Sequence, residues 1–396
     1  MKINRITLII FLLASFFSCS QEESVITSEA TTISYFDEPS DSAAVTSSEK
    51  LEFIADTVAT ELENPWGMEF LPDGTMLVTE RPGRLRMIKD GKLLSEEITG
   101  VPEVVAKGQG GLLDIKLHPD FENNSLLYLS YSAPGDGGSN TAVMRAKLEG
   151  NALTNQEVIF QATPFTDKTH HFGSRIEFDN DGFMYITVGD RGERDKNPQS
   201  LESYCGKVHR LKDDGSIPED NPFVDKEGAV ASIYSYGHRN LQGLAKHPET
   251  GEIWEHEHGP QGGDEVNIIK AGANYGWPVI TYGINYNNTI ITEDTVKAGM
   301  EQPLHYWDPS IAPCGMAFVS SEKYPEWKNN LLVGSLKFRY LARCEIQGGK
   351  VVKEEKLLEN LGRVRAVEQG PDGYIYVAME SPGLLVRIYP AKKTDQ

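Results

Sequence analysis

The sequence predicts an all-β fold, with six blades of β-strands arranged as a propeller. Between Leu51 and Pro390 no segment shows a long helical period, and short apolar runs bounded by Gly, Pro, Asn and Asp dominate. A turn rich in Pro, Asp and Gly, followed by an alternating apolar strand, recurs at spacings of about 45 to 75 residues. Such spacings are typical of propeller blades with inserted loops; an array of β-sandwiches is the alternative.

The recurring turns are expected to mark one blade each. In each repeat an Asp-Gly or Asn-Asn turn reverses the chain, and Val, Tyr, Leu or Ile then alternate with smaller residues. In chain order the repeats are LPDGTMLVTE (Leu71 to Glu80), HPDFENNSLLYLSY (His118 to Tyr131), FDNDGFMYITVGD (Phe178 to Asp190), HPETGEIWEHEHG (His247 to Gly259), SEKYPEWKNNLLVGSLK (Ser321 to Lys337) and GPDGYIYVAME (Gly370 to Glu380). Because one blade cannot bury both of its faces, we expect the blades to pack around a common axis.

The N-terminus, residues 1–19, is predicted to be an export signal. Lys2 and Arg5 form a positive region, and the apolar run Ile6 to Phe17 is shorter than the roughly 20 residues that span a bilayer. The small residue and lone Cys19 that follow resemble a bacterial lipoprotein cleavage site, with an ordinary secretory signal as the alternative. Both interpretations predict an exported protein, either periplasmic or a lipoprotein of the outer membrane or cell surface.

The composition of the segment after the signal predicts where the folded domain begins. Residues 20–50 are rich in Ser, Thr, Glu and Asp and predict a flexible tether, so the propeller domain is expected over 51–391.

Charge and cysteine content exclude some classes of function. The net charge of −20 argues against nucleic-acid binding, which needs a basic face. Cys205, Cys314 and Cys344 match no zinc-site spacing and leave one disulfide open, and no CxxCH motif attaches haem.

The segment from Tyr236 to Trp277 holds the densest group of candidate functional residues. It contains YGHRNLQGL, EHGPQGGDEVN and NYGW. Arg239 and Asn240 place a cation beside an amide, which suits an anionic cofactor. No GxGxxG stands between a strand and a helix, which argues against a Rossmann nicotinamide or flavin site.

The same segment offers oxygen donors for a metal ion. The Gly259-Pro260 turn can aim backbone carbonyls at a cation, and Glu265 and Tyr275 follow with a carboxylate and a phenol. Oxygen donors favour calcium over zinc. A transition metal held by the HxH pair of His256 and His258 is the alternative, and a solvated glutamate with a core tyrosine would need no metal.

His171, in the HHFGSR motif, is the candidate general base. A histidine that enters a strand at the end of a blade can project into the mouth of the central channel. The alternative is a surface or packing histidine. Arg239 and Asn240, expected at the corresponding edge of the next blade, favour the functional interpretation.

Three cations late in the chain predict an anion site. Lys337 ends the strand LLVGSLK, and Arg363 and Arg365 are two residues apart, hence on one strand face. Like charges side by side repel, so an anion between them is the economical explanation. Solvated surface charges are the alternative.

These motifs together resemble the soluble, pyrroloquinoline-quinone (PQQ)-dependent sugar dehydrogenases of the glucose/sorbosone dehydrogenase family. The resemblance runs from about Asn64 to Tyr389 and rests on NPWGMEFLPDG, GQGGLLDI, HHFGSR, VGDRG, GKVHRL, YGHRNLQGL, EHGPQGGDE, NYGWP, SIAP, GSLK and RVRAVEQGPDG. The EHGP and HHFGSR versions are closer to the aldose dehydrogenase branch. The resemblance implies a calcium-dependent enzyme that oxidises aldoses at C1 to lactones, with hydride transfer to the quinone.

The resemblance also implies residue roles. His171 would remove the proton from the anomeric hydroxyl, Asp190 would orient His171, and Arg239 would lie over the quinone carbonyls. The residues implied to bind the quinone are Gln109, Arg239, Asn240, Tyr286, Ser310, Ser335, Lys337, Arg363 and Arg365. The metal residues are Gly259 and Pro260 for a catalytic calcium, and Glu265 and Tyr275 for a structural one.

Some expectations do not follow from the resemblance. His170 stands where the glucose-specific branch tends to carry an acidic residue, so the preferred sugar does not transfer. Without attached haem, electrons must leave to an external acceptor.

A calcium-dependent lactonase and a non-catalytic binding propeller are the alternative functions. The lactonase would need a metal ion bound by several side-chain carboxylates, and it would have no arginine pair.

Overall fold

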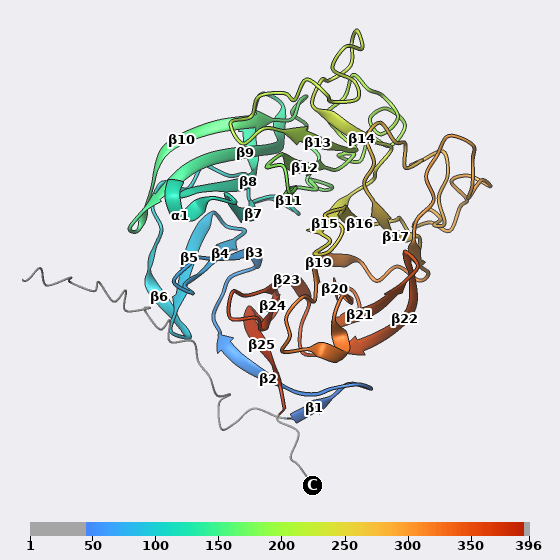
Figure 1. The fold of residues 1–396 in the computed structure, drawn as a ribbon. Helices are drawn as coiled ribbons and strands as arrows, with labels where there is room; N and C mark the ends of the chain where they lie inside the picture. Colours follow the sequence, from blue (N-terminus) through green and yellow to red (C-terminus); the bar gives the residue numbers. More distant parts are fainter. Residues whose placement is uncertain (1–44, 392–396) are drawn as a thin grey trace, which may run out of the picture. The chain divides into compact units, whose positions relative to one another are not determined.

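The computed structural model describes residues 45–391, and almost all of their regular structure is β-strand. Figure 1 shows the strands gathered into blades around a central axis. Within residues 45–391 there are six sheets, so the predicted six-bladed propeller is confirmed. In this part of the chain only α1 (Phe121–Asn124) and the 3-10 helix η1 (Pro325–Trp327) are helical, and neither is long and apolar enough to cross a membrane.

Blades 1 to 5 are four-stranded antiparallel sheets whose strands follow one another in sequence. Blade 1 contains β3 (Pro65–Phe70), β4 (Met76–Glu80), β5 (Arg84–Lys89) and β6 (Lys92–Glu97). Blade 2 contains β7 (Leu112–Leu117), β8 (Leu126–Gly135), β9 (Gly138–Glu149) and β10 (Ala152–Gln161). Blade 3 contains β11 (Ile176–Phe178), β12 (Met184–Val188), β13 (Lys207–Leu211) and β14 (Ile233–Tyr236).

The next two blades repeat this order. Blade 4 contains β15 (Leu241–Lys246), β16 (Ile253–Glu257), β17 (Asp264–Ile268) and β18 (His305–Trp307). Blade 5 contains β19 (Pro313–Phe318), β20 (Leu331–Ser335), β21 (Tyr340–Gln347) and β22 (Lys350–Leu357). Blade 6 contains β23 (Val364–Gln369), β24 (Ile375–Met379) and β25 (Leu384–Pro390), extended by β2 (Glu52–Ala59) and β1 (Val45–Ser47).

Blade 6 closes the ring, because β2 from the N-terminal side pairs with β25 from the C-terminal side. β1 lies inside the flexible tether predicted for residues 20–50, so that prediction was wrong at its end. The backbone of Val45 to Ser47 pairs with β2 and gains the hydrogen bonds that an isolated segment would lack. The predicted export signal, with Cys19, lies outside the described residues.

The recurring turns all connect the first two strands of a blade. In blades 1, 3 and 6 an aspartate oxygen accepts the backbone N–H two residues later at 3.0 Å; these residues are Asp73, Asp179 and Asp372. The glycine in each of these turns has a φ of +80° to +82°, a conformation that favours glycine. The repeats therefore correspond to one hairpin per blade.

Apolar side chains fill the space between neighbouring blades. One cluster joins blades 1 and 2, and the largest joins blade 6 to blades 5 and 1. The innermost strands, β3, β7, β11, β15, β19 and β23, surround the axis (Figure 1). Cys205, Cys314 and Cys344 are buried free thiols, so no disulfide forms among them.

Candidate active site

The candidate catalytic residues lie in loops around the inner strands of blades 3 and 4. His171 precedes β11, Asp190 follows β12, and Arg239 and Asn240 immediately precede β15. These loops approach closely because Gly189 lacks a side chain: a Cβ there would lie 2.3 Å from the carbonyl oxygen of His171. His171 itself has a φ of +57°, a left-handed conformation that side-chain-bearing residues adopt only where surrounding contacts hold them.

His171 and Asp190 form a hydrogen-bonded pair, with Nδ1 of His171 2.7 Å from Oδ1 of Asp190. The same oxygen accepts the backbone N–H of Gly192 at 2.7 Å, and Oδ2 accepts the indole N–H of Trp277 at 2.9 Å. Burial opposes ionisation of Asp190, but the hydrogen bond from His171 and the charge of Arg239 lower its pKa below the ordinary value. Asp190 is therefore an ionised acceptor at neutral pH.

The imidazole of His171 is neutral at neutral pH. Burial and the cation of Arg239 lower its pKa to about 4, although Asp190 opposes the shift. Because Nδ1–H donates to the ionised Asp190, the lone pair lies on Nε2. A neutral, oriented imidazole with its lone pair on the second nitrogen is the form that a general base requires.

A cavity of about 400 Å³, here called the outer cavity, lies beside this pair. His171, Arg239, Pro260 and Tyr286 are among the residues that line it. The volume falls in the range of about 300 to 1,000 Å³ that is common for small-molecule sites. Tyr286, predicted as a wall of the quinone pocket, is 73% exposed and lies in this cavity with the candidate base.

A second cavity, of about 270 Å³, is lined by residues of all six blades and is here called the axial cavity. Gln109, Asn240, Arg363 and Arg365, all predicted to bind the cofactor, line it together. Gln109 also contacts the candidate base, since its Oε1 accepts the backbone N–H of His171 at 2.8 Å. The candidate base and the candidate cofactor residues are thus directly connected.

The two predicted arginines of the axial cavity share a carboxylate of the protein itself. Nε of Arg363 lies 2.7 Å from Oε1 of Glu380, and Nη2 of Arg365 lies 2.5 Å from Oε2. The sequence argument required an anion between these like charges, and Glu380 supplies one from within the protein, so a bound anion here stays a prediction. A third arginine, Arg81, lines the same cavity, and its Nε is buried without a hydrogen-bond partner.

Three other predicted cofactor residues lie outside the lining of the axial cavity. Lys337 is exposed. Ser310 donates its hydroxyl to Oδ2 of Asp264 at 2.6 Å, and the fully buried Ser335 donates to the carbonyl of Ile311 at 2.9 Å. The structure therefore uses both hydroxyls to hold loops and does not bring these three residues to the cavity.

A third cavity, of about 20 Å³, here called the small cavity, is lined by Gly259 but not by Pro260 and has room for one ion or water. Glu257, on β16, faces Glu265 across the register of β17, and both line this cavity. Burial and the charge of Glu257 raise the pKa of Glu265 to about 8. Two crowded carboxylates in one buried space are an arrangement that a cation stabilises.

Tyr275 also lines the small cavity, but its phenol is engaged by the backbone. The hydroxyl donates to the carbonyl of Ile268 at 2.5 Å and accepts the N–H of Lys270 at 3.0 Å. The phenol oxygen predicted to bind calcium therefore forms two hydrogen bonds with the backbone of its own loop.

The HxH pair does not form a transition-metal site. Nε2 of His258 contacts the carbonyl of Pro313 at 2.6 Å, while the carbonyl of His258 accepts Nη1 of Arg239 at 3.0 Å. His256 is fully buried, and burial lowers its pKa to about 3. Within residues 45–391 the group with metal-ligand spacing is instead His238, Glu255 and Glu257.

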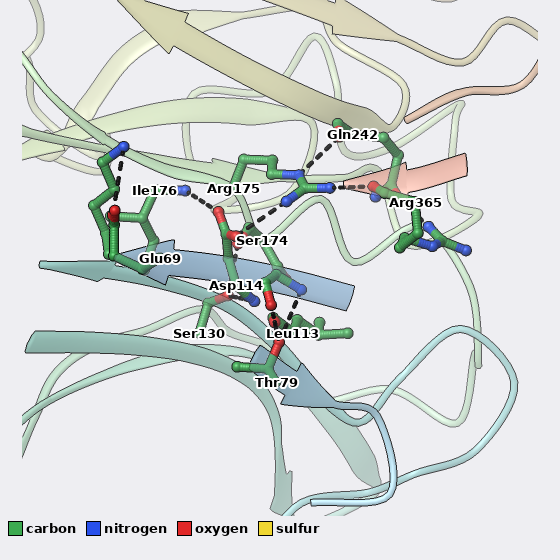
Figure 2. Close-up of polar contacts among 12 residues, drawn as sticks. Glu69, Thr79, Leu113, Asp114, Ser130, Ser174, Arg175, Ile176, Gln242 and Arg365 are labelled. Atoms are coloured by element: carbon green, nitrogen blue, oxygen red, sulfur yellow. Dashed lines mark hydrogen bonds and ion pairs between the residues drawn. The ribbon is translucent and has the colours of Figure 1, made fainter. Parts of the chain in front are cut away.

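A buried ion pair beside Arg365 joins several blades at the axis (Figure 2). Nη1 of Arg175 lies 3.0 Å from Oδ1 of Asp114. Nη2 of Arg175 donates to the carbonyl of Arg365 at 3.1 Å, and Nε donates to the carbonyl of Gln242 at 2.8 Å. These contacts tie blades 2, 3, 4 and 6 together and hold Gln242 and Arg365, which line the axial cavity.

Sequence reasoning missed five residues of the site: Arg81, Glu257, Asp264, Trp277 and Glu380. Asp264 accepts the backbone N–H of Gly259 at 2.9 Å and so braces the predicted calcium turn. Glu257, Asp264 and Trp277 stand inside the quoted motifs EHGPQGGDE and NYGWP, which offered a signal. No local pattern shows that Arg81 lies near Arg365, because their proximity depends on closure of the ring. Glu380 reaches Arg365 within the β23–β24 hairpin, and in sequence it looks like a solvated glutamate.

Comparisons with known proteins agree with this fold. A family model described as Glucose / Sorbosone dehydrogenase matches residues 62–387. Aldose sugar dehydrogenase YliI of Escherichia coli (strain K12) is 44% identical over 300 residues, which cover 74% of this chain and 81% of that protein.

Two solved structures are also similar. The soluble aldose sugar dehydrogenase of Escherichia coli, in its apo-form, has a TM-score of 0.81 and 41% identity, covering 85% of this chain and 99% of that one. The PQQ-bound aldose sugar dehydrogenase of Streptomyces coelicolor has a TM-score of 0.70 and 27% identity, covering 89% and 100%. Because the family model spans most of the chain, this protein belongs to the glucose/sorbosone dehydrogenase family.

Proposed function

We propose that this protein oxidises aldose sugars at C1 to lactones, with PQQ and calcium as cofactors. The observation that carries the proposal is the His171–Asp190 pair, which lines the outer cavity with Arg239 and contacts the axial cavity through Gln109. Family membership supports a sugar dehydrogenase, and the PQQ-bound relative from Streptomyces coelicolor supports the choice of cofactor.

The axial cavity suits an anionic quinone. Its charged lining consists of Arg81, Arg363 and Arg365 against the single carboxylate of Glu380, so positive charge is in excess. The buried Nε of Arg81 has no acceptor among residues 45–391. A cofactor that bears several carboxylates would supply acceptors for these donors.

Within the outer cavity the chain provides the groups for proton removal. Nε2 of His171 would accept the proton of the anomeric hydroxyl, and Asp190 would hold the ring and stabilise the imidazolium that forms. Arg239 would stabilise negative charge that develops on the acceptor. When bound, PQQ supplies the hydride acceptor and calcium supplies a Lewis acid.

Calcium fits the blade 4 loops at two places. Asp264 braces the Gly259-Pro260 turn, whose carbonyls would hold the catalytic ion. Glu265, with its raised pKa beside Glu257, would hold a structural ion in the small cavity. Carboxylate and carbonyl oxygens are the ligands that calcium prefers.

Two further parts of the proposal concern the cellular setting. The N-terminal segment supports export, with anchoring through Cys19 if the lipoprotein interpretation holds. Because the sequence contains no CxxCH motif, electrons would leave the reduced cofactor to an external acceptor.

The proposal is tested by adding PQQ and calcium to the purified protein and measuring dye reduction with glucose and other aldoses. Activity that needs both additions and is lost in His171→Ala is the expected result. An absence of sugar-dependent reduction, with bound quinone demonstrated by absorbance, would overturn it. Hydrolysis of a lactone by the same sample would favour the lactonase alternative.

A further inference from the structure

Glu380 occupies an unusual position for a carboxylate, inside a cavity that we assign to an anion. It follows β24 and lies, partly buried, between two guanidinium groups. Its Oε1 lies 2.7 Å from Nε of Arg363, and its Oε2 lies 2.8 Å from Nε and 2.5 Å from Nη2 of Arg365. Burial opposes its charge, but Arg365 and Arg363 lower the pKa of Glu380, so it is ionised at neutral pH.

Both arginines are also held by other acceptors. Nη1 of Arg365 donates to Oε1 of Gln242 at 3.2 Å and to Sγ of Cys314 at 3.1 Å. Nη1 of Arg363 donates to the carbonyl of Leu336 at 3.1 Å. Each guanidinium group therefore has an acceptor besides Glu380, and what Glu380 alone adds to the pair is a negative charge.

That charge acts on the whole cavity. Burial and the nearby cation of Arg365 lower the pKa of Arg81, while Glu380 opposes the shift. Removing the carboxylate would leave Arg81, Arg363 and Arg365 as the charged lining of the axial cavity. Mutual repulsion would rise in the cofactor-free protein, and attraction for an added anion would rise with it.

We propose that Glu380 is a built-in counter-anion that stabilises the cofactor-free propeller and weakens binding of the anionic cofactor. This inference rests on the proposed function, because it assigns the cofactor to the axial cavity. The carboxylate shares the two arginines with the ligand and so keeps the cofactor exchangeable.

The test compares wild type with Glu380→Gln, which keeps the side-chain shape and removes the charge. PQQ titration with calcium, followed by absorbance, is expected to give at least a tenfold lower Kd for the variant. The melting temperature without PQQ is expected to fall. The matched control is Glu157→Gln, which removes a carboxylate paired at 2.8 Å with Arg145 on an outer strand of blade 2 and should leave Kd unchanged.

An equal or higher Kd for Glu380→Gln would overturn the proposal, because the carboxylate would then orient the arginines instead of competing with the ligand. If this variant does not fold, Arg363→Gln is compared with Arg363→Gln/Glu380→Gln. The double variant is expected to bind PQQ at least tenfold more tightly than the single variant. Equal affinities of the two variants would contradict the role proposed for Glu380. If wild type itself binds no PQQ, the proposed function fails rather than the role of Glu380.

Discussion

Nδ1 of His171 lies 2.7 Å from Oδ1 of Asp190, and this contact orients the imidazole toward the outer cavity. The carboxylate is in turn held by Gly192 and Trp277, from two different loops. The proton on Nδ1 is thereby committed, and the basic nitrogen is Nε2. Blades 3 and 4 must both be in place for this geometry, since Trp277 belongs to the long connection within blade 4.

Replacement of His171 by Ala is expected to lower kcat by at least about 100-fold, because general-base catalysis contributes roughly that much or more. PQQ affinity should stay close to wild type. Steady-state dye reduction with the reconstituted variant measures kcat. His305→Gln, on edge strand β18, is the control and should keep its turnover. Near-wild-type turnover of His171→Ala would remove the residue from the base role.

Replacement of Arg363 by Ala is expected to weaken PQQ binding, since the loss of a charge-assisted hydrogen bond costs roughly 1.5 to 3 kcal/mol. This corresponds to about a 10- to 140-fold higher Kd by titration. Lys337→Ala should have a smaller effect, because its side chain is exposed and outside the axial lining. The KM for sugar should change less than the Kd for PQQ in both. Unchanged titration curves for both variants would contradict the cofactor site.

Chelation of calcium is expected to lower the melting temperature even without PQQ, since an ion bound only by the native state stabilises it. Glu265→Gln should lose most of this calcium-dependent stabilisation but retain calcium-dependent PQQ binding. Melting curves with and without chelator decide the point, with Glu157→Gln as the charge-matched control. Identical responses of wild type and Glu265→Gln would contradict the structural site at the small cavity.

Stability should fall with acidification partly through His209. Burial lowers the pKa of its imidazole to about 3, from about 6.5 in an unfolded chain. Between these values the unfolded state binds a proton that the native state does not, so stability decreases as the pH falls from 6.5 toward 3. The free energy of unfolding of His209→Gln should depend less on pH, by up to about 1.4 kcal/mol per unit. Urea unfolding at pH 6, 5 and 4 measures both slopes, and parallel slopes would contradict the assignment.

Local chemistry explains why so much of the fold was predictable. Three of the six turns are specified locally: at Asp73, Asp179 and Asp372 a side-chain oxygen accepts the backbone N–H two residues later, and a glycine adopts the positive φ. Each strand after a turn is largely buried, as a strand packed between neighbouring blades requires. The repeat therefore predicted the number of blades and the order of the hairpins.

The site was predictable only where its residues lie inside local motifs. HHFGSR and VGDRG identified His171 and Asp190, which the structure places 2.7 Å apart. The arginine pair was identified, but its partner was not, because Glu380 lies on the next strand of the hairpin and looked like any solvated glutamate. Ser335 looked available in sequence and is instead buried against the carbonyl of Ile311.

The number of blades, the family resemblance and the candidate base depend on residues that are neighbours along the chain, so the amino-acid sequence predicts them. Which charges meet depends on how distant segments fold together. Closure of the ring sets Arg81 of blade 1 beside Arg365 and Glu380 of blade 6 in one cavity, and it pairs β2 with the C-terminal strand β25. Electrostatic energies depend on distance and burial, and these quantities are created when the blades close around the axis.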